Sequence, residues 1–268
     1  MKRVWMVVLI GLGLLQLFGT EIAFAQEKNF YVTLGLKAWL PDWQTSFLNA
    51  DPSFSGANIT SLTSDPEVAT IPSVSLKYKN LFVSGGYFLN KEFTFPEFSD
   101  RSTYAAPTGT LLDTYKVTAK REETDINLGY FVTPNLALSL GYKNISQEYH
   151  TVITTPGFLD LVSDSETKIV GPTVGIIGAA GIGGGLALYG NFSFGLLKAE
   201  YEGVSEKDNA TYVSSELGVV YKIQDTPLSV SLGYKYQAID TEPSDPDASE
   251  LTGVDVTKGF IFGTNLTF

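Results

Sequence analysis

The chain has 268 residues, of which 44% are hydrophobic and 13% aromatic, and its formal net charge is −11. Beyond the N-terminus no apolar run reaches the roughly 20 residues that a membrane-spanning helix needs. The acidic balance opposes binding to nucleic acid, because like charges repel. The absence of cysteine excludes disulfides, cysteine-ligated zinc, thiol catalysis and a lipoprotein anchor.

Residues 1–25 have the three parts of a secretory signal peptide. Residues 2–3 are basic, residues 4–18 are almost wholly apolar, and residues 23–25 form the small–x–small site of a signal peptidase. The apolar run is short for a retained membrane anchor. We therefore expect this segment to be cleaved, which leaves residues 26–268 as a single domain.

The body of the chain alternates between apolar and small or polar residues with a period of two. The segment 30–40 places Phe30, Val32, Leu34, Leu36 and Leu40 on one face, and Tyr31, Thr33, Gly35, Lys37 and Trp39 on the other. Segments 136–143, 186–196 and 228–237 repeat this pattern, which is typical of β-strands. A soluble sandwich would bury the apolar face against a second sheet. In a membrane barrel that face meets lipid, and the small and polar face lines the lumen.

Tight connections alternate with long ones along the chain. The tight connections are residues 79–80, 131–135, 179–184 and 223–227, and the long ones are residues 41–71, 91–113, 150–166, 200–209 and 240–254. Outer-membrane barrels have short periplasmic turns and longer extracellular loops. The pattern therefore predicts about ten antiparallel strands. Eight or twelve are the alternatives, because residues 54–70 could contain a further hairpin.

The last ten residues form the most specific pattern in the chain. One face carries Phe260, Phe262, Thr264, Leu266 and the terminal Phe268. With the signal peptide and the alternating strands, this end resembles the C-terminal signature of the bacterial outer-membrane β-barrel superfamily. The resemblance implies an all-β, antiparallel up-and-down barrel in the outer membrane, in contact with lipid and lipopolysaccharide. It also implies that Phe268 is part of the signal that the barrel-assembly machinery recognises.

The alternation also predicts which charged side chains enter the lumen. The inward set is Lys37, Lys77, Arg121, Glu123, Asp125, Lys143, Glu216, Lys222 and Lys235. If Tyr130 faces Leu136 across the turn at Pro134, Glu123 stands opposite Lys143. Barrels of about this size are usually filled by side chains. We therefore expect a charged network that narrows or plugs the lumen.

Three functions are compatible with this outline. The first is a small porin-like or structural barrel that passes small solutes at most. The second is a surface adhesion or binding protein that acts through its acidic extracellular loops. One such loop carries Asp240, Glu242, Asp245, Asp247 and Glu250 and has no basic residue.

The third function is a hydrolase at the barrel rim. Ten strands are also the number in the omptin proteases, which this architecture resembles, and barrel lipid A deacylases pair a histidine with a serine. His150 is the only histidine; Glu148 and Asp160 could orient it, and Ser146 shares its strand parity. The sequence matches no motif of either enzyme family, so we assign no catalytic, cofactor-binding or metal-binding residue and expect a protein that is not an enzyme.

Overall fold

The computed structural model describes residues 29–46, 61–101, 112–203, 207–242 and 253–268, so the predicted signal peptide lies outside the described residues. All regular structure in these segments is β. The strands are β1 (Phe30–Thr45), β2 (Leu62–Thr63), β3 (Ala69–Tyr78), β4 (Leu81–Thr94), β5 (Phe98–Arg101), β6 (Leu112–Thr133), β7 (Leu136–Thr154), β8 (Leu161–Gly183), β9 (Leu186–Tyr201), β10 (Lys207–Lys222), β11 (Leu228–Glu242) and β12 (Gly253–Thr267). The described part holds no helix that is long and apolar enough to cross a membrane.

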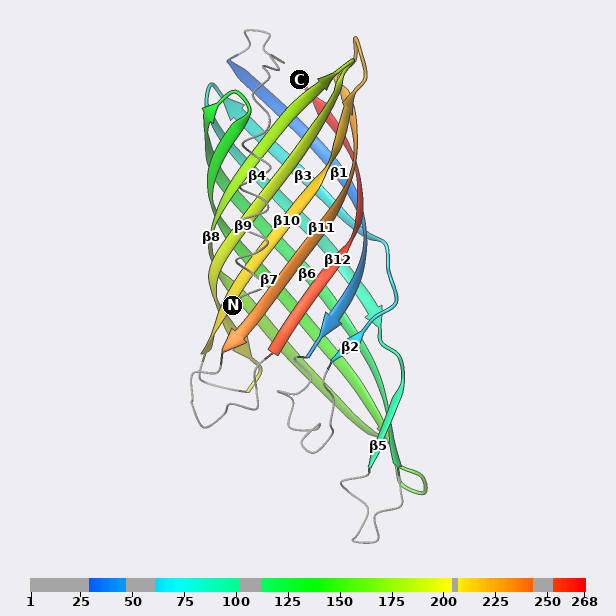
Figure 1. Cartoon of the computed structure of the whole chain (residues 1–268). Helices are drawn as coiled ribbons and strands as arrows, with labels where there is room; N and C mark the ends of the chain where they lie inside the picture. Colours follow the sequence, from blue (N-terminus) through cyan, green and yellow to red (C-terminus); the bar gives the residue numbers. More distant parts are fainter. Residues whose placement is uncertain (1–28, 47–60, 102–111, 204–206, 243–252) are drawn as a thin grey trace.

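The strands form one closed antiparallel barrel. Each strand of the ring pairs with the next, and β12 returns to pair with β1 from Thr33↔Thr267 to Thr45↔Asp255. The short strands β2 and β5 add to the ends of β1 and β6, outside the ring (Figure 1). Within the described residues the ring therefore has ten strands, which confirms the predicted number and the up-and-down connectivity.

Both faces of the barrel wall follow the predicted alternation. Outward side chains such as Leu36, Leu140 and Phe262 are more than half exposed, at 54%, 65% and 52%. Their inward neighbours in sequence are small or polar residues, or residues buried in the lumen. The outward apolar band ends on β7 at Tyr142, beyond which Asn144, the next outward residue, is polar.

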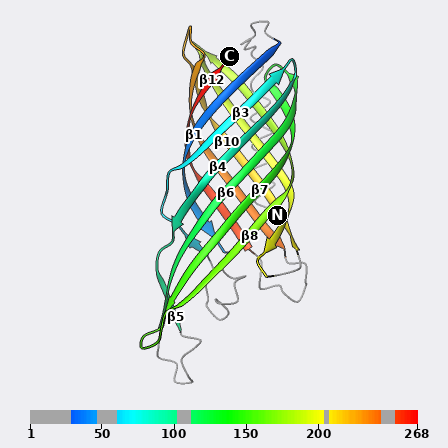
Figure 2. The same ribbon diagram turned by 180° about the vertical axis from the view of Figure 1, so that it is seen from behind.

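Three strands continue far beyond this band. β6, β7 and β8 have 22, 19 and 23 residues, whereas a strand needs about 9–11 residues to cross a bilayer. Together with β5 they project past the rest of the rim (Figure 2). The predicted long loops are shorter than expected for this reason, and residues 150–166 shrink to a connection of residues 155–160. Strand pairing simply continues into water, with polar residues such as Glu148 on the outer side.

One tight turn forms later than predicted. β8 runs on to Gly183, because Ala179 still pairs with Tyr189 and Gly181 with Ala187. The chain reverses only at Gly184 and Gly185, whose φ angles of +61° and +84° are readily adopted only by glycine. The turns predicted at residues 79–80, 131–135 and 223–227 form where expected.

Candidate functional site

A buried layer of charge crosses the middle of the lumen. Arg121, on β6, lies with its Nε 2.8 Å from Glu123 Oε1 and its Nη1 2.9 Å from Asp255 Oδ1 on β12. The Arg121 side chain is completely buried. Three strands of the ring separate β6 from β12 in one direction and five in the other, so this bridge links opposite walls of the barrel.

Two amides complete the bonding of these carboxylates. Gln147, on β7, donates from Nε2 to Asp255 Oδ2 at 2.6 Å, and Gln237, on β11, donates to Glu123 Oε1 at 2.9 Å. The Tyr149 hydroxyl in turn donates to Gln147 Oε1 at 3.1 Å. Charged groups can persist in a water-free interior only when they are paired and hydrogen-bonded, and this layer meets that condition for both carboxylates.

Lys143 extends the layer along β7. Its Nζ lies 2.6 Å from Glu123 Oε2 and 2.6 Å from Asp125 Oδ2, and its side chain is fully buried. We define the charged layer as Arg121, Glu123, Asp125, Lys143 and Asp255. Its members carry two positive and three negative charges when ionised.

The predicted register of the β6–β7 hairpin was wrong by two residues. The structure pairs Tyr130 with Leu138 rather than Leu136, so that Asp125, not Glu123, stands opposite Lys143. The cause is a tighter turn than expected, because the ladder continues to Thr133↔Leu136 and leaves only Pro134 and Asn135 between the strands; an extra residue on β6 between Phe131 and Thr133 then moves the register by one residue. Glu123 still reaches Lys143, because a long side chain spans the diagonal between neighbouring strands.

A second ion pair lies nearer the periplasmic end. Lys37 Nζ is 2.7 Å from Glu216 Oε1, which also accepts a hydrogen bond of 2.9 Å from the Tyr189 hydroxyl. Lys235 sits 4.4 Å from the centre of the Trp39 ring, a distance at which a cation is attracted to the ring face. The charges predicted to lie inside are thus largely brought together by the fold.

Two predicted lumen lysines lie apart from this cluster. Lys77 is half-buried, and its Nζ lies 4.1 Å from the centre of the Phe131 ring. Lys222 is the last residue of β10 and is exposed at the periplasmic end of the barrel. Neither belongs to the charged layer.

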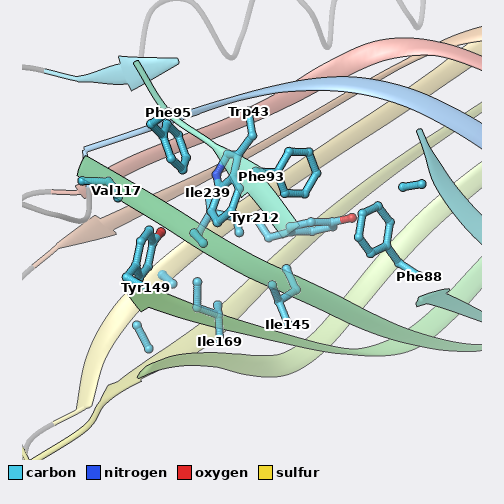
Figure 3. Packing of buried hydrophobic residues seen from close by; sticks show 14 of the residues in the cluster. Trp43, Phe88, Phe93, Phe95, Val117, Ile145, Tyr149, Ile169, Tyr212 and Ile239 are labelled. Atoms are coloured by element: carbon cyan, nitrogen blue, oxygen red, sulfur yellow. The ribbon is translucent and has the colours of Figure 1, made fainter. Parts of the chain in front are cut away.

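Aromatic and aliphatic side chains fill the lumen beside the charged layer. The centre of the Trp43 ring lies 5.3 Å from that of Phe93, 5.5 Å from Phe95 and 5.7 Å from Tyr149 (Figure 3). The Arg121 guanidinium carbon is 5.2 Å from the Trp43 ring centre, which joins the two layers. We define the aromatic layer as Trp39, Trp43, Phe88, Phe93, Phe95, Tyr115, Tyr149 and Tyr212, with Ile145, Ile153, Ile169 and Ile239 packed among them.

The exposure of inward side chains changes along the barrel axis. Trp39, Trp43, Arg121 and Lys143 are 0–1% exposed, so atoms pack against them on all sides. Toward the periplasmic end several inward residues are small or polar and partly accessible: Gly35, Ser73, Asn127, Gly141, Ser193 and Ser231. Other inward residues of this end, such as Phe82, Ala137 and Ala187, are 0–6% exposed. The lumen is therefore packed throughout its extracellular part and only partly accessible from the periplasmic end.

Part of this site was not predicted from the sequence. Asp255 was missed because it borders the loop expected at residues 240–254, although it shares the inward parity of Thr257 and Ile261. Gln147 and Gln237 carry no charge and were not singled out. The aromatic layer was missed because the inward face was expected to be small or polar throughout, whereas Val117 and Tyr149 show that it becomes apolar toward the extracellular end.

His150 lies on the outer surface of the wall rather than in the lumen. Its Nδ1 is 2.7 Å from Asp164 Oδ1, and the two side chains are 52% and 74% exposed. The partner is thus Asp164 on β8, and not Glu148 or Asp160 as the sequence suggested. The Ser146 hydroxyl donates to Glu166 Oε1 at 3.1 Å, so it is not directed at the histidine in this structure.

The described residues contain no group of three or more histidine, cysteine or acidic residues placed to hold a metal ion. Of the acidic loop singled out in the sequence, Asp245, Asp247 and Glu250 lie outside the described residues.

A closed ten-stranded ring with an outward apolar band and a polar, charged lumen defines a transmembrane β-barrel. The family model of the outer membrane protein beta-barrel domain matches residues 10–262, and the chain belongs to that family. It is therefore a protein of the outer membrane, as its C-terminal pattern predicted.

Two solved outer-membrane proteins are similar to this chain. The outer membrane protease OmpT of Escherichia coli is similar at 14% identity, over 92% of this chain and 99% of that one, with a TM-score of 0.50. The translocator domain of the autotransporter NalP of Neisseria meningitidis is 10% identical, over 91% and 90% of the two chains, with a TM-score of 0.43. No curated protein sequence matches significantly. At 14% identity the likeness to the protease concerns the fold alone.

Proposed function

We propose that this protein is a plugged outer-membrane barrel with a structural or surface-presenting role, and not an open porin. One observation carries the proposal: the charged and aromatic layers fill the lumen, with Arg121, Lys143 and Trp43 completely buried between opposite walls. An aqueous channel requires water beside its lining residues, and open channels belong to barrels with more strands.

The extracellular part of the barrel supports a role at the cell surface. β6, β7 and β8 extend beyond the apolar band and carry β5 with them. A barrel that served only as a conduit gains nothing from such a projection, whereas a binding surface is displayed by it. The rim hydrolase stays a prediction, supported here by the short contact between His150 and Asp164.

We expect the refolded mature protein to give no stable ion-conducting steps in planar lipid bilayers. The physical reason is that ions cannot pass a layer of packed side chains without displacing it. An open trimeric porin inserted into the same membranes is the positive control for the recording. Stable steps of constant size from the wild-type protein would contradict the proposal.

A further inference from the structure

The hairpin tip between β7 and β8 bears a group of exposed apolar side chains. Phe158 is 61% exposed, Leu159 92%, Leu161 45% and Val162 59%. Single exposed apolar residues are ordinary on protein surfaces, but a contiguous group marks an interaction site. We name Phe158, Leu159, Leu161 and Val162 the apolar tip.

The backbone holds the apolar tip in one shape. Phe158 N donates to Thr155 O at 3.0 Å, and Gly157 has a φ of +84°. With Pro156 at the second position, these are the features of a type II turn. The Thr155 hydroxyl donates to the buried Asp113 carboxylate at 2.6 Å, which ties the turn to β6. The tip is therefore presented by a rigid hairpin, and its binding would cost little conformational entropy.

Apolar side chains cover the tip on both sides of the hairpin. Leu161 pairs with Ile153, whose side chain faces inward, and Val162 pairs with Val152, whose side chain faces outward. Because residues opposite each other in a ladder share a face, Leu161 and Val162 point in opposite directions. A protein pocket that covered one face would leave the other in water, whereas lipid can surround a convex tip completely.

A polar row follows immediately behind the tip. His150 and Asp164 pair on the outer face, and Thr151 pairs with Ser163 on the inner face. The apolar part is thus only a few residues deep. At about 3.3 Å per residue this depth is comparable to the roughly 5–10 Å by which interfacial segments enter a bilayer.

The tip stands too far from the protein's own membrane to enter it. The outward apolar band on β7 ends at Tyr142, and the tip begins beyond Val152. At about 3.4 Å per residue and a strand tilt of about 35–45°, that stretch rises roughly 25 Å. The long strands carry the tip away from the barrel toward the medium outside the cell (Figure 2).

We infer that the apolar tip inserts into the surface of a second, opposing lipid membrane with zwitterionic headgroups. Charge selects the headgroups, because the two carboxylates Asp160 and Asp164 at the tip outweigh the single charge of Lys116, which pairs with Val152 beside Val162, and the whole chain carries a net charge of −11. Segments that bind anionic membranes are instead rich in lysine and arginine. The same acidity opposes contact between the tips of two copies of this chain.

The test uses the mature protein in lipid nanodiscs and separate vesicles of phosphatidylcholine. We expect the nanodiscs to float with these vesicles, and to float less with vesicles that contain phosphatidylserine. The double substitution Phe158→Ser/Leu159→Ser should weaken binding by about a hundredfold, because two apolar side chains no longer leave water. Asp160→Asn should strengthen binding, since it removes the charge that must stay near water.

Two controls separate insertion from other effects. Ile182, 60% exposed at the opposite, periplasmic turn, provides the matched variant Ile182→Ser, which should bind like the wild type. Because the chain lacks cysteine, Leu159→Cys accepts a single environment-sensitive fluorophore, whose emission should shift to the blue with vesicles. The same label at Glu148→Cys on the polar wall should not shift.

Four outcomes would overturn the inference. They are the absence of flotation with phosphatidylcholine, equal flotation of the Phe158→Ser/Leu159→Ser variant, stronger binding to phosphatidylserine, and pairing of nanodiscs without vesicles through a second copy. A tip that captures a protein but does not bind vesicles would also overturn the inference, because flotation with phosphatidylcholine would then be absent.

Discussion

Arg121→Met should lower the free energy of unfolding by about 3–5 kcal/mol, because it leaves the buried Asp255 carboxylate without a cation and Glu123 with Lys143 alone. Glu123 and Asp255 would each lose a contact shorter than 3 Å in a place that water does not reach. Methionine retains much of the packing volume, so that the loss reports on charge rather than on a cavity. Urea unfolding, followed by the fluorescence of the buried Trp39 and Trp43, measures it.

Two controls accompany this substitution. Lys91→Met breaks an ion pair with Glu67 whose side chains are 32% and 39% exposed, and should cost no more than about 1 kcal/mol. Arg121→Met/Glu123→Gln/Asp255→Asn removes all three charges together and should recover most of the stability. If Arg121→Met lowered the free energy of unfolding no more than Lys91→Met does, the charged layer would have to be hydrated.

Trp43→Ala should have the second large effect, a loss of about 3–5 kcal/mol together with the appearance of ion leakage. The indole is completely buried among Phe93, Phe95 and Tyr149. Its removal leaves a cavity that packed neighbours fill only partly, next to the Arg121 guanidinium. Water that enters this cavity would hydrate the charged layer and offer ions a path.

Conductance in planar bilayers and urea unfolding measure the two parts of this prediction. Trp43→Phe should restore most of the stability and keep the lumen closed. Leu140→Ala changes an outward side chain that is 65% exposed and should affect neither current nor packing in the lumen. If the Trp43→Ala barrel conducted no ions, the aromatic layer would not be what closes the lumen.

The fold could be predicted almost completely from the sequence, because a period of two is imposed on every strand by the contrast between lipid and lumen. The alternation of Phe260, Phe262 and Leu266 with small residues is an example. The same contrast ends where the bilayer ends. From Asn144 to His150 the outward positions are polar, so the alternation of apolar and polar residues is lost, and the sequence predicts a loop for the end of β7, residues 150–154.

The sequence predicts most of the residues that belong to the charged site, but not which of them are in contact. Parity placed Arg121, Glu123 and Lys143 in the lumen, because a charge on the lipid side is costly. Which of them meet depends on the register, and the extra residue between Phe131 and Thr133 leaves no mark in the pattern of hydrophobicity. Contacts across the barrel, such as Arg121 with Asp255, depend in addition on the closure of the whole ring.

The central claim is that the lumen is closed from the extracellular side. The accessibility of a single cysteine in the lumen tests this claim most directly. Ser231, on the inward face in the periplasmic part of the barrel, can be replaced by cysteine in a chain that has none. In proteoliposomes whose barrels all have the extracellular end outward, a small charged thiol reagent added outside should not modify Ser231→Cys. The same reagent trapped inside should modify it, and Leu159→Cys should react from outside. Modification of Ser231→Cys from the extracellular side would contradict the account, because it would require an open path through the charged and aromatic layers.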